Sequence, residues 1–178
     1  MTGCTYKCFT DTVHDTTKLH DYFFAEALSK LKYGGIMAFV TSAGTLDERD
    51  ETTRQMLADK ADFIGAIRLP GDKNGAFKDN AGTEVTTDII FLKKHEGKSL
   101  AELSDIPDWV HIGETADGLP INKYFEQHPD MVLGTVVEGN KLYGSGTMVV
   151  AEDGFDLKSA LHEAVGKLSA EISHERGR

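Results

Sequence analysis

Three apolar runs of strand length lie in the first half of the chain, and a helical pattern separates only the first two. The runs are GIMAFVTS at residues 35–42, FIGAIRLP at 63–70 and TTDIIFLKK at 86–94. Continuous apolar runs of this length are typical of strands buried on both faces of a sheet. A helix between two strands predicts a parallel crossover. The third run follows a polar loop without a helix, so we expect it to be antiparallel to its neighbour.

Helical patterns flank the first run. The segment before it, Leu19–Lys32, predicts a helix, with Gly34 suited to the left-handed position after its end. The segment after it begins with Thr45-Leu46-Asp47-Glu48, which has the spacing of a capping box and predicts one helix to about Lys60. The first helix has its apolar residues on one face: Phe24, Ala27, Leu28 and Leu31.

The second half of the chain predicts an α+β extension. Residues 109–113 have the composition of a short strand, 121–129 that of a short helix, and 131–154 that of two β segments around a glycine-rich turn. Asp156 is placed to cap a final helix. Five apolar residues of that helix have regular helical spacing: Leu157, Leu161, Val165, Leu168 and Ile172.

These patterns divide the chain into three parts. We assign residues 1–18 to an N-terminal arm, 19–96 to a sheet domain and 97–178 to the α+β extension that ends in a helix. In the arm, Cys4 and Cys8 lie near His14 and His20, a spacing that would allow a zinc site. Two reduced thiols in an irregular arm are the alternative that we favour, because structural zinc sites have tighter ligand spacing.

The composition excludes some classes of protein. The chain has 19 basic and 29 acidic side chains, which gives a formal net charge of −10. This charge argues against a basic module that binds nucleic acid irrespective of sequence, although it leaves a local basic patch open. No apolar run has the length of a membrane span, so we expect a cytoplasmic protein.

Residues 19–168 resemble part of a known enzyme family. The stretches FFAEALSKLKYGGIMAFVTS, FIGAIRLP and AFKDNAGTEVTTDIIFLKK look like the C-terminal half of the adenine-N6 DNA methyltransferases, which have the class I S-adenosylmethionine-dependent fold. NKYFEQHPDMVLG and GFDLKSALHEAVGKL are similar to the segment that follows this domain in large helicase–methylase proteins of phages and mobile elements.

The resemblance implies an α/β fold, a partial doubly wound (Rossmann-like methyltransferase) mixed sheet with an α+β appendage. In this fold the strand near 86–93 lies between those near 36–41 and 63–69, antiparallel to both.

The chain departs from the family at the motifs that carry the chemistry. It has neither the glycine-rich cofactor turn with its acidic residue nor the Asn/Asp-Pro-Pro-Phe/Tyr motif, since its four prolines are never adjacent. We therefore assign no catalytic residue. We also expect this chain to bind no S-adenosylmethionine by itself, although the complete family domain requires that cofactor, and to be inactive alone.

The resemblance also implies a set of residues that bind the target base. Phe77 occupies the place of a loop aromatic that packs on the flipped adenine, and Asn80, Thr83 and Thr86 accompany it. The alternative reading is that Phe77 covers the sheet edge and that the threonines, Thr87 included, are ordinary residues at a strand entrance.

Three further residues have interpretations of their own. Asp88 lies within an apolar strand, where a lone carboxylate is costly, and Arg68 on the adjacent strand is its expected partner. Ser42 ends the first run, where α/β sheets place ligands, and could flank a pocket in a complete domain.

Two functions are favoured over a third, an unrelated small α/β enzyme, for which the sequence offers no nucleophile–base pair, metal spacing or phosphate loop. The first is part of a DNA adenine-N6 methyltransferase that contacts DNA through the complete enzyme. The second is a non-catalytic assembly or DNA-associated binding module. In either case the edge of the 35–42 strand lacks a neighbour, which favours a homodimer, the missing N-terminal methyltransferase half, or a cover supplied by residues 1–17.

Overall fold

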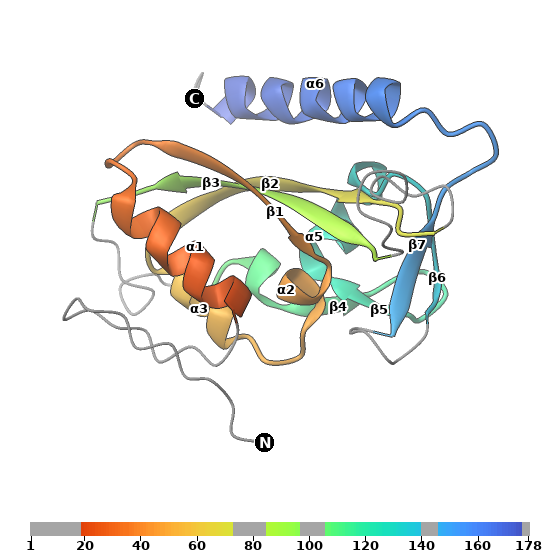
Figure 1. Ribbon diagram of the computed structural model, residues 1–178, viewed down its shortest axis with the longest axis horizontal. Helices are drawn as coiled ribbons and strands as arrows, with labels where there is room; N and C mark the ends of the chain where they lie inside the picture. The colour runs from red at the N-terminus through yellow and green to blue at the C-terminus, as the bar shows by residue number, and fades with distance from the viewer. Residues whose placement is uncertain (1–18, 73–84, 97–105, 140–145, 176–178) are drawn as a thin grey trace.

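The computed structural model describes residues 19–72, 85–96, 106–139 and 146–175 (Figure 1). Its centre is a three-stranded sheet of β1 (Ile36–Ser42), β2 (Ala61–Leu69) and β3 (Thr87–Lys94) in the order β1-β3-β2. β3 is antiparallel to both neighbours. The prediction that the third apolar run is central and antiparallel to the other two is therefore confirmed. The fold is mixed α/β with antiparallel strand pairs, and it shows no complete doubly wound sheet within the described residues.

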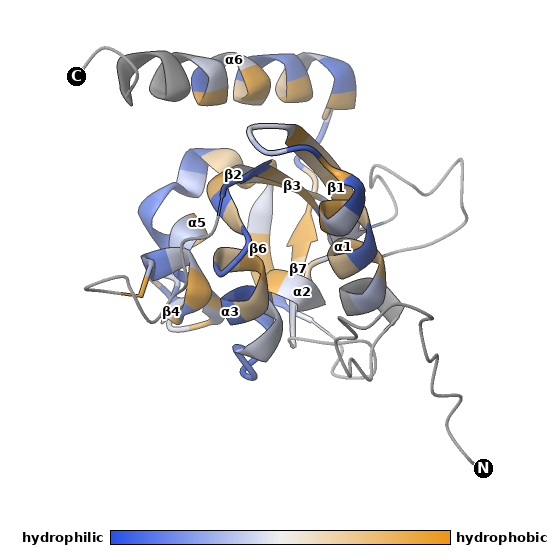
Figure 2. Cartoon of the chain, turned by 90° about the vertical axis from the view of Figure 1, so that its left-hand side faces the viewer, coloured by the Kyte–Doolittle hydropathy of each residue, from blue (hydrophilic) through white to orange (hydrophobic). Residues whose placement is uncertain are grey.

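Helices α1 (Leu19–Lys30), α2 (Gly44–Asp47) and α3 (Thr52–Ala58) lie on one side of this sheet, and α6 (Leu157–Glu175) lies on the other (Figures 1 and 2). The ring of Phe24 on α1 lies 4.3 Å from that of Phe39 on β1, centroid to centroid. As predicted, α1 buries Phe24 and Leu28, and Gly34 after it has a φ of 75°, the left-handed conformation that suits glycine.

The single helix predicted from Thr45 to Lys60 is wrong, because α2 ends at Asp47 and Glu48 is extended. The Thr45 hydroxyl does not form the capping box, since it shares a hydrogen bond of 2.9 Å with the Thr41 hydroxyl. Asp47, the last residue of α2, faces inward and bonds to Arg68. The predicted continuous helix is interrupted at this contact. The next helix, α3, starts where the Asp50 carboxylate accepts from the Thr52 backbone N–H.

The C-terminal extension shares one hydrophobic core with the sheet. Trp109 stacks on Phe63 of β2 at 4.6 Å between ring centroids, and Tyr124 meets the same ring edge-on. The extension contains η2 (Asp108–Val110), β4 (Ile112–Glu114), β5 (Pro120–Asn122), α5 (Lys123–Gln127), η3 (Pro129–Met131), β6 (Thr135–Glu138), β7 (Thr147–Val150) and α6.

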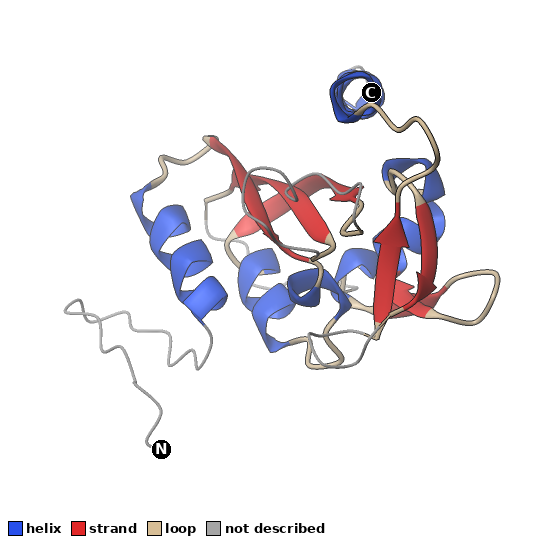
Figure 3. Ribbon diagram, turned by 45° about the vertical axis from the view of Figure 1, so that its right-hand side comes forward, coloured by secondary structure: helices blue, strands red, loops and turns tan. Residues whose placement is uncertain are grey.

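The predicted short helix and the two β segments of the extension are confirmed. The strand predicted over 109–113 is displaced, because η2 occupies its first residues and β4 begins at Ile112. β6 and β7 form an antiparallel pair that stands beside the three-stranded sheet (Figure 3).

Helix α6 crosses the face of β2 that the other helices leave open. Its predicted cap is confirmed, because the Asp156 carboxylate accepts from the backbone N–H and the hydroxyl of Ser159. Of the regularly spaced apolar residues, Leu168 is buried but Val165 is 39% exposed, and Ala164 beside it is buried instead. Gly65 on β2 allows this close crossing, since a Cβ there would lie 2.4 Å from Leu168 Cδ1.

No helix within the described ranges is long and apolar enough to cross a membrane. Those ranges also contain no group of three metal-ligating side chains. The Cys4, Cys8, His14 and His20 side chains, which the zinc interpretation requires, lie outside what the structure describes.

Candidate functional site at the carboxyl ends of β1 and β2

Strands β1 and β2 have their carboxyl ends at the same end of the sheet, because both are antiparallel to β3. Ser42 at the end of β1 and Leu69 at the end of β2 are each paired with Thr87 at the start of β3. The chain leaves the sheet here after β2 and returns here to begin β3. Residues 73–84, which carry most of the predicted base-binding set, therefore connect two points at this end of the sheet (Figure 1).

A buried cluster of charged side chains, Arg68, Asp88 and Asp47, lies near this end of the sheet. Arg68 donates from Nε and Nη2 to the two carboxylate oxygens of Asp88, both at 2.8 Å. It also donates from Nη1 and Nη2 to the two oxygens of Asp47, at 2.7 and 2.9 Å. The guanidinium lies 4.3 Å from the centroid of the Phe125 ring. The predicted Arg68–Asp88 pair is confirmed, and Asp47 is a second carboxylate that the prediction lacked.

The electrostatics of the cluster hold Arg68 charged. Burial by itself lowers the pKa of Arg68, but the charges and hydrogen bonds of Asp47 and Asp88 outweigh it and raise that pKa above its ordinary value. Burial raises the pKa of Asp88, and the Arg68 charge opposes this shift. Because all three side chains are at most 4% exposed, the cluster is a structural element rather than a solvent-accessible acid or base.

Asn122 ties the extension to this cluster. Its backbone N–H donates to Asp47 Oδ1 at 3.0 Å, and its side-chain amide donates to the carbonyls of Leu46 and Trp109. Its side-chain oxygen accepts from the Tyr124 N–H and so caps α5. One buried asparagine therefore joins α2, η2 and α5.

A second buried arginine, Arg54, holds α3 against the extension. Its Nε donates to the Val110 carbonyl at 2.6 Å and its Nη1 to the Thr45 carbonyl at 3.3 Å. Burial lowers the pKa of Arg54, and the charge of Glu51 opposes the shift most strongly. Its Nη2 has no hydrogen-bond partner among the described residues.

The described residues that flank 73–84 are bound to β7 and to Ala151, which follows it. Thr86, the one predicted base-binding residue that the structure describes, is buried and accepts from the Val149 N–H at 2.9 Å. Gly71 donates its N–H to the Val149 carbonyl at 2.9 Å. The Asp72 side chain accepts from the Ala151 N–H at 3.1 Å.

The other predicted site residues have different outcomes. Phe77, Asn80 and Thr83 lie outside the described residues. Ser42 is half-buried at the end of β1, beside Thr87 of the neighbouring strand.

Sequence reasoning missed Asp47, Arg54, Asn122 and Asp72. A signal existed for Asp47, since Arg68 within an apolar strand needs more acceptor oxygens than one carboxylate offers a guanidinium. The capping-box spacing placed Asp47 within a predicted continuous helix and so concealed that signal.

Strand β1 exposes a continuous apolar row. Ile36 is 57% and Val40 is 52% exposed, and Ala38 between them is exposed as well. No strand among the described residues pairs with the outer edge of β1. The strand contains no charged residue, no proline and no bulge in its pairing, which are the usual protections of an edge.

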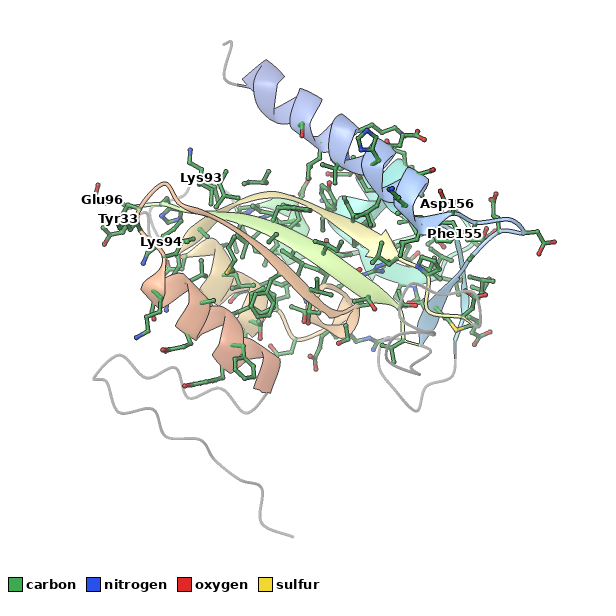
Figure 4. The ribbon with its side chains drawn as sticks, turned by 45° about the horizontal axis from the view of Figure 1, so that its top comes forward. Tyr33, Lys93, Lys94, Glu96, Phe155 and Asp156 are labelled. Atoms are coloured by element: carbon green, nitrogen blue, oxygen red, sulfur yellow. The ribbon has the colours of Figure 1, made fainter. Side chains whose placement is uncertain are left out.

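The basic residues at the end of β3 belong to the opposite end of the sheet. Figure 4 shows Tyr33, Lys94 and Glu96 together there, far from Phe155 and Asp156. Lys94 Nζ donates to the Leu28 and Leu31 carbonyls at 2.7 and 2.8 Å, so this lysine caps the C-terminus of α1.

Comparison with known proteins adds little to this geometry. No family model and no curated protein matches the chain. One solved structure, described as the structural basis of complex assembly and conformational transition of the type I R-M system, is similar over 55% of the chain, with 20% sequence identity and a TM-score of 0.39. The chain spans 20% of the length of that protein.

Proposed function

We propose that this chain is the C-terminal part of an S-adenosylmethionine-dependent DNA adenine-N6 methyltransferase. The observation that carries the proposal is β3, which is inserted antiparallel between β1 and β2 in the order that the sequence resemblance implies. This insertion returns the chain to the carboxyl ends of β1 and β2, where open α/β sheets place their ligands. Residues 73–84, which include Phe77, are joined to the sheet at that end.

In this proposal the chain supplies the sheet core and the loop that holds the target base. Phe77 stacks on an adenine that has been rotated out of the duplex, and Asn80 and Thr83 contact its edge. Thr86 supports the loop rather than the base, because it is buried and its hydroxyl accepts from the Val149 N–H. The complete enzyme makes the remaining contacts with DNA, while this loop holds an unpaired base by itself.

The described residues do not fit the cofactor. Its ribose hydroxyls require an accessible carboxylate, whereas the carboxylates at this end of the sheet are buried. Asp47 and Asp88 bind Arg68, and Asp72 accepts from the Ala151 N–H. S-adenosylmethionine would therefore be held by the part of the domain with the glycine-rich turn. The catalytic amine-binding motif belongs to that part too, so we propose that this chain is inactive alone.

Binding of an unpaired base tests the proposal. The probe is a DNA duplex with 2-aminopurine opposite an abasic site, measured by fluorescence anisotropy. We expect Phe77→Ala to lose about 1–3 kcal/mol of binding free energy, the range for loss of one base–aromatic stack. The matched control is Phe23→Ala, because Phe23 is 49% exposed on α1, on the helix-covered side of the sheet. Equal affinity of the wild type and Phe77→Ala contradicts the proposal.

The exposed row on β1 favours a second candidate, an assembly module. An uncharged edge strand recruits another strand, either from a second copy in a two-fold dimer or from the missing methyltransferase half. Light scattering tests the first arrangement. We expect a mass of two chains for the wild type and of one chain for Val40→Lys, with Phe23→Lys as the dimeric control. A monomeric wild type contradicts the homodimer.

A further inference from the structure

The face of the central sheet that carries α6 is apolar across its width, but α6 packs only over β2 (Figure 2). Phe91 of β3 is paired with Ala38 of β1 and with Gly65 of β2, against which Leu168 of α6 lies. Because side chains alternate between the two faces of a strand, the β1 side chains on this face are Ile36, Ala38 and Val40. All three are exposed, so this side of the face has no cover among the described residues.

An ion pair shows how α6 is rotated about its own axis. Lys167 Nζ lies 3.4 Å from the Asp130 carboxylate of η3. The chain after η3 runs along the outer edge of β2, where the Leu133 N–H donates to the Arg68 carbonyl. Lys167 therefore points away from β1. Val165 precedes it by two residues, about 200° around the helix, and so points toward β1.

Val165 and the exposed row of β1 thus form one apolar surface. We call it the β1 face and define it by its four exposed residues: Ile36, Ala38, Val40 and Val165. Its floor is the sheet, and its wall is the flank of α6 that Val165 occupies.

The β1 face has the width of one helix. Neighbouring strands lie about 4.8 Å apart, which puts β1 roughly 9.6 Å from β2. Packed helices have their axes about 8–10 Å apart. A helix that lay over β1 would therefore touch α6 at Val165. The lengths agree as well, since the 19 residues of α6 span about 28 Å and the 7 residues of β1 about 23 Å.

We infer that a second copy of this chain covers the β1 face in a two-fold dimer, with α6 of each copy over β1 of the other. The inference rests on the assembly candidate of the proposed function and deepens it by naming the surface. A two-fold axis that runs between the two α6 helices, along their length, places both helices in one layer with a sheet on either side. Val165 then meets its own copy, and the exposed side chains of both β1 strands are covered by one self-complementary contact.

The outward side of α6 suits such a contact, because it presents two serine side chains that are already hydrogen-bonded. The hydroxyl of Ser159 donates to Asp156, and that of Ser169 donates to the Val165 carbonyl. An apolar strand can therefore cover these hydroxyls without leaving a donor unpaired. Lys167 lies on the flank that faces η3, outside the contact.

The hydrogen-bonding edge of β1 is not used in this dimer. It remains available for a strand of the missing methyltransferase half, so the two forms of assembly do not compete. A dimer built by β1 pairing edge to edge is a different arrangement, because it leaves α6 far from the contact.

The experiment measures the mass of the full chain by light scattering. Val165→Lys and Val165→Glu each place like charges together at the two-fold axis, so we expect each variant alone to fall from a mass of two chains to that of one. An equimolar mixture of the two variants should regain a mass of two chains, because opposite charges then meet. Phe23→Lys is the control, since Phe23 is exposed on the opposite side of the sheet and that variant should stay dimeric.

A cysteine provides a second test if the charged variants do not fold. Helices in contact bring facing Cα atoms to about 4–5 Å, which a disulfide can span. With Cys4 and Cys8 changed to serine, oxidation of Val165→Cys should give a covalent dimer, whereas Phe23→Cys should not. Absence of the Val165→Cys dimer overturns the inference.

The outcomes separate this inference from the functions proposed above. A Val165→Lys chain that stays dimeric overturns the inference alone, because β1 strands paired edge to edge would not be affected by a change on α6. A mixture that stays monomeric also overturns it. A monomeric wild type overturns both this dimer and the homodimer of the assembly candidate. Binding of the 2-aminopurine duplex tests the methyltransferase proposal separately, and its failure would not alter the measured mass.

Discussion

Arg68 and Asp88 lie directly opposite each other on neighbouring antiparallel strands and form a bidentate ion pair, with two nitrogen–oxygen distances of 2.8 Å. The pair stands in the interior of the molecule, where desolvation cancels much of the Coulomb attraction. Its geometry compensates, because four hydrogen bonds from one guanidinium satisfy two carboxylates. The cluster therefore joins β2, β3 and α2 at one point.

Removal of the arginine should destabilise the chain strongly. We expect Arg68→Met to lose about 3–5 kcal/mol of unfolding free energy, because it leaves two buried carboxylates without a counter-ion. Urea denaturation measures this loss. The control is Lys167→Met, which breaks exposed ion pairs with Asp130 and Glu163 and should change stability by less than about 1 kcal/mol. Similar losses in the two variants would refute a structural role for the cluster.

Substitution of Gly65 should force α6 away from the sheet. Gly65 has a φ of 153°, and its Cβ would lie 2.4 Å from Leu168 Cδ1. We expect Gly65→Ala to cost about 1–3 kcal/mol through overpacking. Addition of Leu168→Ala should recover part of that loss, which a double-mutant cycle of urea denaturation detects.

Gly166→Ala is the matched control, since nothing lies within 4 Å of a Cβ there. In a helix interior that change should stabilise the chain by about 0.5–1 kcal/mol. Additive effects of the Gly65 and Leu168 substitutions would show that the two residues do not meet.

The cap of α6 should make the stability of the chain depend on pH in a specific way. The hydroxyl of Ser159 donates to Asp156 and lowers the pKa of that carboxyl below its ordinary value of 3.8. A carboxyl whose pKa is lowered in the folded state stabilises that state above its unfolded pKa, and the contribution disappears as the pH falls through the folded pKa. The stability difference between wild type and Asp156→Ala should therefore be full at neutral pH and vanish in acid.

Thermal unfolding at a series of pH values from neutral to below 3.8 measures this difference. Asp153→Ala is the control, since it removes an exposed aspartate ahead of the helix. A difference between wild type and Asp156→Ala that is independent of pH would mean that the carboxylate charge does not contribute to the cap.

The chain alone should not bind S-adenosylmethionine. The buried carboxylates at the carboxyl ends of the strands are already bound, Asp47 and Asp88 by Arg68 and Asp72 by the Ala151 N–H, and the sequence has no glycine-rich cofactor turn. Isothermal titration calorimetry should show only the heat of dilution. Saturable binding in the micromolar range would contradict the prediction and place a cofactor site within these residues.

Much of the sheet could be predicted because its signals are local. Runs such as IMAFV and DIIFL indicate strands by composition alone, and the missing helix before Thr87 restricts the direction of β3. The expected burial on both faces is wrong for β1, which leaves Ile36, Ala38 and Val40 exposed. The Arg68–Asp88 pair was predictable for a related reason: a charge within an apolar strand requires a partner, and the adjacent strand offers one.

The break after Asp47 was not predictable from local pattern. The Thr45–Glu48 spacing satisfies the rule for a capping box, but the backbone becomes extended at Glu48. Asp47 instead bonds to Arg68, which follows 21 residues later. Asn122 and Asp72 are similar cases, since each bonds to a segment more than 70 residues away in sequence. Tertiary contacts of this range leave no periodic trace in the sequence.

The central position of β3 has a consequence for synthesis of the protein. Strands β1 and β2 are not neighbours, and the strand that joins them within the described residues is β3, which is the last of the three to leave the ribosome. Ile36 cannot pair until Lys93, its partner on β3, has been synthesised. Translation adds roughly 5–20 residues per second, so the nascent chain presents two unpaired apolar strands for several seconds. The sheet then forms in one late step. Before that step, a chaperone that binds nascent chains would be most needed.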